Sequence, residues 1–180
     1  MIFETSRLIL RPWHEEDAPS LYKYAKDPAV GPIAGWPVHT DVENSRQIIK
    51  DALAAQGTYA VTLKNQGEAI GSIALMIGDK SNIAIASDEG EIGFWIGVPY
   101  CGKGLIPEAV RELIRYGFEE LHLKKIWCGY FEGNEKSKRV QEKCGFKYHH
   151  TEKDIKWALM NDIRTEHITC MTKEQWDEML

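Results

Sequence analysis

Hydrophobic residues recur along this chain with two periods, one typical of strands and the other typical of helices. Alternating or continuous β-rich stretches predict strands over residues 7–12, 58–64, 68–78, 91–98, 125–131, 146–160 and 164–171. Helical spacing predicts helices over residues 14–28, 41–56, 109–121, 134–144 and 172–180. This order of elements predicts an α/β (α+β) fold with a largely antiparallel mixed sheet.

Capping and turn residues support these boundaries. Thr40 and Asp41 are both suitable N-caps for the second helix, and Asn134 is a suitable N-cap for the fourth. Gly145 follows that helix as a C′ glycine. The stretch 31–39 is dense in glycine and proline, so we expect it to be a loop.

Length and composition restrict the class of protein. The 180 residues are expected to form a single domain, long enough to bury its own core. A content of 43% hydrophobic and 27% charged residues is typical of globular proteins. The net charge of −5 argues against nucleic-acid binding and fits a basic or amine-bearing partner better.

Cysteine usage and hydropathy indicate the cellular compartment. The four cysteines form no C-x-x-C pair, which fits free thiols in a reducing cytosol and gives no zinc-site spacing. The pair His149-His150 lies on a predicted strand, where adjacent side chains point to opposite faces, so we expect no metal site there. No signal-peptide pattern and no membrane-length apolar run is present. We therefore expect a cytoplasmic protein that binds neither a membrane nor a metal.

The most informative stretch is VPYCGKGLIPEAV, residues 98–110, which precedes an amphipathic run. Residues 97–103 match G-x-x-x-x-G-K, the start of a P-loop, but Gly104 stands where a P-loop has Ser or Thr for magnesium. Pro99 also removes one amide donor from such a loop. A P-loop-like nucleotide binder is therefore a weaker alternative.

Free amides at a helix N-terminus still bind phosphate oxygens, and glycine lets those oxygens approach the main chain. The pattern therefore indicates a pyrophosphate-binding turn without a magnesium site. The simpler alternative is a strand-to-helix turn that only needs glycine. The candidate phosphate-binding residues are Gly102, Lys103, Gly104, Leu105 and Ile106.

The segments EIGFWIGVPYCGKGLIPEAV and KIWCGYFEGNEKSKRVQEKCGFKY, in this order, closely resemble the GNAT superfamily of N-acetyltransferases. The beginning, ETSRLILRPWHEEDAPSL, and Asn134-Glu135-Lys136-Ser137 resemble the branch of ribosomal-protein-alanine N-terminal acetyltransferases. The resemblance covers about residues 5–171. In the family's Q/R-x-x-G-x-G/A pattern, Gly102 and Gly104 match, whereas Pro99 replaces the leading polar residue.

The resemblance implies the GNAT fold, whose mostly antiparallel sheet is splayed at its central strands and carries helices on both faces. It also implies that acetyl-CoA lies in the gap, with its pantetheine arm pairing with the strand 91–98. Ile96, Gly97 and Val98 are then candidate cofactor contacts, and the Val98 amide is a candidate oxyanion donor. Gly93 and Gly97 share one face of this strand and leave room for a ligand, unless they serve a bulge or close helix packing.

Aminolysis of a thioester requires a neutral amine and a protonated leaving thiolate. Glu91 is the candidate base, and the alternative is an exposed carboxylate paired with a lysine. Ser137 is the candidate acid, and the alternative is simple helix capping together with Asn134. The resemblance implies that Asn134 and Ser137 contact the cofactor.

These features predict an acetyl-CoA-dependent N-acetyltransferase that acetylates a protein N-terminus or a small-molecule amine by direct transfer in a ternary complex. The alternative of another class is a non-catalytic acyl-CoA-binding module on the same fold. A homodimer is a reasonable expectation for a small enzyme.

Overall fold

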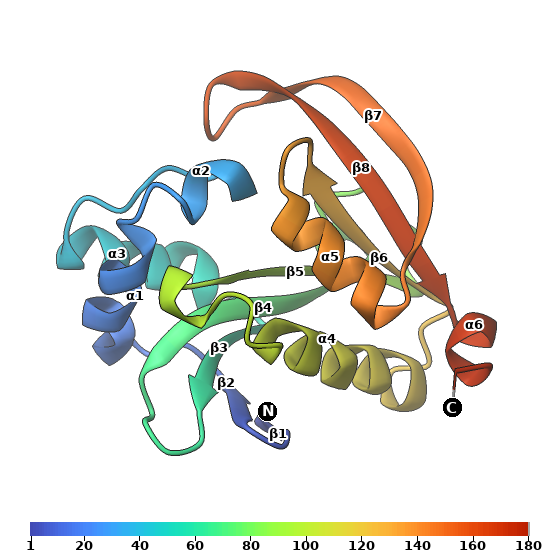
Figure 1. Ribbon diagram of the computed structural model, residues 1–180, viewed down its shortest axis with the longest axis horizontal. Coiled ribbons are helices and arrows are strands. Elements are labelled where there is room, and N and C mark those ends of the chain that lie inside the picture. Colours follow the sequence, from blue (N-terminus) through green and yellow to red (C-terminus); the bar gives the residue numbers. More distant parts are fainter. Residues whose placement is uncertain (180) are drawn as a thin grey trace.

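The computed structural model describes residues 1–179, and Leu180, the last residue of the predicted terminal helix, lies outside the described part. The described residues form an eight-stranded sheet with the order β1-β2-β3-β4-β5-β6-β8-β7 (Figure 1). Every neighbouring pair is antiparallel except β5 and β6, which are parallel. The predicted mixed, largely antiparallel sheet is confirmed.

The strands are β1 Phe3–Glu4, β2 Leu8–Arg11, β3 Thr58–Leu63, β4 Ala69–Ile77, β5 Glu89–Ile96, β6 Lys125–Phe131, β7 Lys147–Trp157 and β8 Asp162–Thr172. The helices are α1 Ala18–Ala25, α2 Gly31–Ala34, α3 Val42–Ile48, α4 Leu105–Arg115, α5 Glu135–Cys144 and α6 Lys173–Asp177. Every predicted element is present with adjusted bounds.

The short helix α2 was not predicted, because it lies in the segment 31–39 that the sequence indicates as a loop. Pro32 stands in its first turn, where the missing N–H costs nothing, and Gly35 ends it with a φ of 96°. The same two residue types that suggested a loop thus begin and end a single helical turn.

Helices cover both faces of the sheet (Figure 1), and each face has its own core. On one face, α4 buries Leu113 and Ile114 against Ile92 of β5. On the other, α1 and the segment after α3 bury Leu21 and Ile49. The apolar stripe of α4 recurs every three to four residues, which explains why this helix was predicted from its pattern.

The two central strands separate after a short parallel ladder. β5 and β6 pair only from Glu89↔Lys125 to Glu91↔Trp127, whereas β5 continues along β4 as far as Ile96↔Gly71. Beyond Glu91, the edges of β5 and β6 therefore face each other without pairing. The predicted splay between the central strands is confirmed, and it creates the gap in which the site lies.

The long β7–β8 hairpin curls back toward α2 (Figure 1). The indole Nε1 of Trp157 donates a 2.6 Å hydrogen bond to the carbonyl of Gly35, and Arg164 Nη1 donates one of 2.9 Å to the carbonyl of Pro32. These contacts fix α2 beside the gap, so the segment expected to be a loop becomes part of the wall of the site.

A bulge in β7 changes the prediction for its histidines. The register shifts between Tyr148 and His150, and the Nδ1 atoms of His149 and His150 lie 2.8 Å apart. Strict alternation, which would place the two rings on opposite faces, is therefore wrong at this position. Within residues 1–179, no group of three or more His, Cys, Asp or Glu side chains is arranged to hold a metal ion.

Candidate active site

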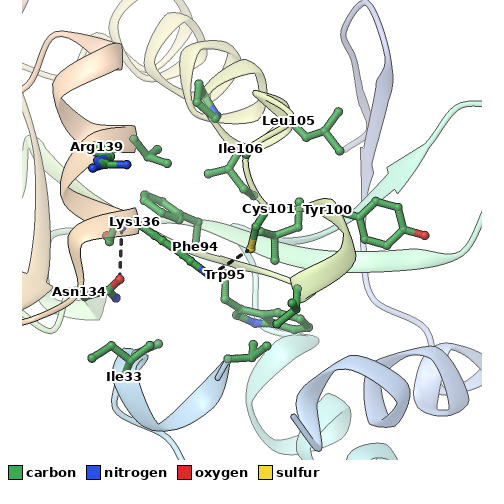
Figure 2. A pocket seen from close by; sticks show the side chains of 18 of the residues that line it. Ile33, Phe94, Trp95, Tyr100, Cys101, Leu105, Ile106, Asn134, Lys136 and Arg139 are labelled. Atoms are coloured by element: carbon green, nitrogen blue, oxygen red, sulfur yellow. Dashed lines mark hydrogen bonds between the residues drawn. The ribbon is translucent and has the colours of Figure 1, made fainter. Parts of the chain in front are cut away.

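A cavity of about 390 Å³ lies between the free part of β5, the beginning of α4, and α5 (Figure 2). It contains most of the residues that the sequence predicts as cofactor contacts. Those that line it are Ile96, Val98, Gly102, Gly104, Leu105, Ile106, Asn134 and Ser137. Glu91, Gly97 and Lys103 do not line it.

The free edge of β5 offers main-chain groups to a ligand. The N–H of Gly97 points to β4, where it donates to the carbonyl of Ile70. The carbonyl of Ile92 points to the other neighbour, β6, where it accepts from Cys128 Sγ at 3.0 Å. Since main-chain groups of a strand alternate between its two neighbours, Phe94 and Ile96 direct theirs toward the gap. An extended amide chain can therefore pair with β5 as an added strand.

The turn between β5 and α4 presents unpaired amides. Gly102 and Gly104 have φ values of 76° and 73°, a region that glycine adopts without strain. No hydrogen bond among residues 1–179 uses the N–H of Gly102, Gly104, Leu105 or Ile106. Pro107 follows and has no N–H to satisfy. The beginning of α4 is therefore well suited to phosphate oxygens, because its dipole adds to these donors.

Arg7 holds this turn from the start of β2. Its guanidinium donates to the carbonyls of Lys103 and Gly104 at 2.9 and 3.1 Å, and its Nε donates to Glu108 Oε2 at 2.7 Å. Burial alone would raise the pKa of Glu108, but the hydrogen bonds from Thr5 and Arg7 lower it below its usual value. Lys103 does not line the cavity, and its Nζ lies 5.5 Å from the ring centre of Tyr100.

Helix α5 carries the polar residues on the opposite side of the cavity. Asn134 is its N-cap and accepts from the N–H of Ser137 at 3.2 Å, so the capping role that the sequence predicts for Asn134 is confirmed. Ser137 faces the cavity one turn into the helix. Its hydroxyl therefore does not cap the helix, and its position is that of a side chain available to a ligand.

Gln141, which sequence reasoning missed, determines how Ser137 is hydrogen-bonded. Its Nε2 donates to the carbonyl of Gly129 at 3.0 Å and to Ser137 Oγ at 3.2 Å, while its Oε1 accepts from Thr169 Oγ1 at 2.7 Å. The carbonyl of Gly129 can only accept, which fixes the orientation of the buried amide. Ser137 therefore accepts from Gln141 and keeps its own proton free to donate.

Three cations of α5 also line the cavity, namely Lys136, Arg139 and Lys143. Figure 2 shows the first two beside Asn134. Within residues 1–179, none of the three forms an ion pair. Their spacing of three and four residues places them on one face of the helix, a signal that the sequence contained. They give the cavity a positive side opposite the α4 turn, as expected for a ligand with several phosphates.

The two glycines of β5 serve different purposes. A Cβ on Gly97 would lie 2.6 Å from Cδ1 of Tyr24 on α1, so this glycine permits close helix packing rather than ligand access. A Cβ on Gly93 would meet only Met76 Cε, at 3.6 Å. Room for a ligand, predicted at both positions, is thus present only at Gly93.

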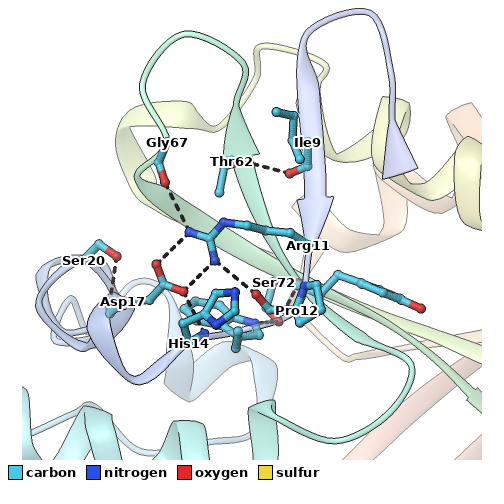
Figure 3. A network of polar contacts seen from close by, with 11 residues as sticks. Ile9, Arg11, Pro12, His14, Asp17, Ser20, Thr62, Gly67 and Ser72 are labelled. Carbon is cyan, nitrogen blue, oxygen red and sulfur yellow. Dashed lines mark hydrogen bonds and ion pairs between the residues drawn. The ribbon is translucent and has the colours of Figure 1, made fainter. Parts of the chain in front are cut away.

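The position of α1 is fixed by an ion pair at the end of β2. Arg11 and Asp17 form two hydrogen bonds of 2.7 Å, and Asp17 also accepts from the N–H of His14 at 3.0 Å (Figure 3). Burial would raise the pKa of Asp17, but these hydrogen bonds lower it. The network thereby holds the helix that places Tyr24 against Gly97.

Glu91 lies at the bottom of the gap, at the last paired position of β5 and β6. It is only 5% exposed, and its Oε2 accepts from Ser81 Oγ and from the N–H of Asn82, both at 2.7 Å. The alternative of an exposed carboxylate paired with a lysine is therefore wrong. The observed contacts bind Glu91 to the loop 78–88, and its role as a base stays a prediction.

The chain matches a model of the acetyltransferase (GNAT) domain over residues 7–147. It belongs to the GNAT family of N-acetyltransferases. The "Uncharacterized N-acetyltransferase p20" of Bacillus licheniformis is 35% identical over 127 residues, which cover 68% of each chain. The "Putative ribosomal N-acetyltransferase YdaF" of Bacillus subtilis is 43% identical over 76 residues, or 42% of this chain and 41% of that protein.

Solved structures of other acetyltransferases share the fold of this GNAT protein over nearly the whole chain. A GNAT-family acetyltransferase of Bacillus anthracis has a TM-score of 0.83 at 24% identity, covering 97% of this chain and 99% of that one. The ribosomal-protein-S5-alanine acetyltransferase of Vibrio fischeri has a TM-score of 0.73 at 22% identity, covering 98% of both chains. None of the helices within residues 1–179 combines the length and apolar character needed to cross a bilayer.

Proposed function

We propose that this acyltransferase is acetyl-CoA-dependent and acetylates a primary amine by direct transfer in a ternary complex. The observation that carries the proposal is the cavity itself, which joins the unpaired amides at the start of α4 to the free edge of β5. A site for phosphates and a site for an added strand would thus be continuous, as a molecule with a pyrophosphate and a thin amide arm requires.

The residues present fit such a molecule. The turn 102–106 and the cations Lys136, Arg139 and Lys143 would hold phosphate groups, and Phe94 and Ile96 would pair with the amide arm. Acetyl-CoA supplies the activated acetyl group as a thioester. The Val98 N–H begins a short 3₁₀ turn, has no partner inside that turn, and is the candidate donor to the developing oxyanion.

Ser137 is proposed as the acid that protonates the leaving thiolate. The support is its hydrogen bond from Gln141, which leaves the Ser137 proton free to be donated. A serine that served only the helix cap would not need the hydrogen bond from Gln141. No covalent enzyme intermediate is required, because a deprotonated amine can attack the thioester directly.

Calorimetric titration with acetyl-CoA, with CoA and with ATP plus magnesium tests the cofactor. We expect binding of acetyl-CoA and CoA, and none of ATP, because the turn offers no Ser or Thr for magnesium. Turnover is then measured as thiol release with peptides that carry a free N-terminus and with small primary amines. The name of the YdaF relative makes N-terminal peptides of ribosomal proteins the first acceptors to include. Binding without thiol release for any amine would contradict the catalytic proposal.

A further inference from the structure

The bottom of the gap is framed by two glycines. Extending the ladder from Glu91↔Trp127 by two residues places Gly93 of β5 opposite Gly129 of β6, at the point where the strands have separated. A Cβ on Gly93 would meet only Met76 Cε, at 3.6 Å, so the face of β5 is uncovered at this level. The two strands are unpaired here, whereas one residue earlier the carbonyl of Ile92 still accepts a hydrogen bond from Cys128 Sγ of β6.

Two carboxylates from different strands converge on this opening, on the face of the sheet opposite α4. Glu91 comes from β5, and Glu166 comes from β8, where it is paired with Phe131 of β6 and with Glu152 of β7. The carboxylate of Glu166 occupies the space that a Cβ on Gly129 would need. Gly129 thus allows Glu166 to reach across β6 toward the gap.

The two carboxylates differ in what they are bonded to. Glu91 accepts two short hydrogen bonds from Ser81 and Asn82, and both fix the loop 78–88. Glu166 is partly exposed, and within residues 1–179 its carboxylate has neither a hydrogen-bond partner nor an ion-pair partner. An unpaired carboxylate has free lone pairs for a cationic ligand.

We propose that Glu166 is the general base that takes the proton from the acceptor ammonium, and that Glu91 is a positioning residue. This assignment rests on the proposed acetyltransfer. The Glu166 carboxylate accepts one proton from R–NH₃⁺, and the neutral amine forms the C–N bond with the thioester carbonyl. The C–S bond then breaks, the Ser137 hydroxyl gives its proton to the thiolate, and the proton lost by the new amide nitrogen restores Ser137. Glu166 finally releases its proton to water.

The surroundings of Glu166 suit this role. Burial raises the pKa of Glu166 to about 7, and the negative charges of Glu91 and Glu152 add to the effect. Cys128 of β6 also interacts with the charge of Glu166, and Arg164, two residues along β8, has its guanidinium paired with Asp162. A base with a pKa near the working pH removes protons efficiently. The same carboxylates attract a cationic amine to the gap.

The test compares Glu166→Gln with Glu91→Gln in pH profiles of kcat/KM between about pH 5.5 and 9, at saturating acetyl-CoA. The probe is a short peptide with a free N-terminus, whose amine has a pKa of about 8. For Glu166→Gln we expect a loss of about 10-fold at pH 7, because only about a tenth of an amine with a pKa of about 8 is neutral at that pH. We also expect loss of the inflection near pH 7 and recovery of rate as the free amine accumulates. Glu91→Gln should retain an inflection, moved to lower pH because this variant also removes a negative charge beside Glu166, and it should mainly weaken peptide binding.

Glu152→Gln is a second variant, which leaves the site intact but removes one negative charge beside Glu166. The inflection in the kcat/KM profile of this variant should move to lower pH, because the pKa of Glu166 falls when the neighbouring negative charge is removed. If Glu166 were only structural, the inflection would not move. An unchanged inflection in Glu166→Gln, or its loss in Glu91→Gln alone, would overturn the assignment. A wild-type protein that binds acetyl-CoA but acetylates no amine would instead overturn the proposed function itself, and the base with it.

Discussion

The carboxylate of Glu108 accepts hydrogen bonds from both the main-chain N–H and the guanidinium Nε of Arg7, each at 2.7 Å. Arg7 thereby joins the start of β2 to the first turn of α4, and its remaining nitrogens hold the carbonyls of the glycine turn. The shape of the proposed phosphate-binding turn therefore depends on a residue about a hundred positions earlier.

Replacing Arg7 should weaken acetyl-CoA binding without slowing the chemical step. Arg7→Met keeps the aliphatic stem but loses the bonds to the turn, so we expect the Kd for acetyl-CoA to rise about 3- to 10-fold, roughly 1 kcal/mol. The value of kcat at saturation should change little. Arg46→Met is the matched control, since Arg46 forms, within residues 1–179, one ion pair, with Glu43 on α3. A fall in kcat with unchanged Kd would contradict this role.

We expect Ser137 to act in the chemical step and Asn134 to act in the stability of the fold. Ser137→Ala should lower kcat about 10- to 100-fold with little effect on the Kd for acetyl-CoA. Asn134→Ala should instead lower the melting temperature, because losing an N-cap costs about 1 kcal/mol. An acetyl thioester of a more acidic thiol should rescue Ser137→Ala, since its thiolate leaves without a proton. Equal losses with both thioesters would rule out the acid role.

Local signals in the sequence were sufficient for most strands, for five of the six described helices and for the turn at 102–104, whereas the splay and the cofactor contacts were expected from the family resemblance. Gly102 and Gly104 mark a turn, Asn134 marks a cap, and the apolar stripe of α4 marks a buried face. Each of these signals lies within a few residues of the feature it predicts. The one short helix that was missed, α2, has only Pro32 and Gly35 as signals, and both are equally common in loops.

Features that depend on contacts between distant strands could not be predicted. The pairing of Glu166 with Phe131 is set by the order in which β8 inserts between β6 and β7. Nothing in the neighbourhood of Glu166 in the sequence distinguishes it from a surface glutamate on a strand. Gln141 was missed for the same reason, since its partners Gly129 and Thr169 lie on other elements.

Gly129→Ala should disable the site by displacing Glu166. A Cβ at this position would occupy the place of the Glu166 carboxylate, so we expect kcat/KM to fall to the level of Glu166→Gln. The double variant Gly129→Ala/Glu166→Gln should be no slower than either single variant, because both remove the same group. Binding of acetyl-CoA should persist in all three. Additive losses in kcat/KM would show that Gly129 acts independently of Glu166.

The raised pKa of Glu166 should be visible in stability as well as in rate. Because its pKa rises from 4.5 unfolded to about 7 folded, the native state binds this proton more tightly. The free energy of unfolding therefore falls as pH rises from about 4.5 to 7 and then levels off. At pH 8 the ionised, partly buried carboxylate costs on the order of 1–2 kcal/mol, whereas at pH 5 it is protonated in the native state and costs little.

Glu166→Gln should therefore raise the melting temperature at pH 8 and leave it nearly unchanged at pH 5, as scanning calorimetry at the two pH values can measure. Glu108→Gln is the control of opposite sign, because hydrogen bonds from Thr5 and Arg7 lower the pKa of Glu108. That variant should be less stable than the wild type at pH 8, and the difference should shrink as pH falls through the folded pKa. A Glu166→Gln protein that is destabilised at pH 8 would mean that the ionised carboxylate is a stabilising group in the native state, contrary to its unpaired position.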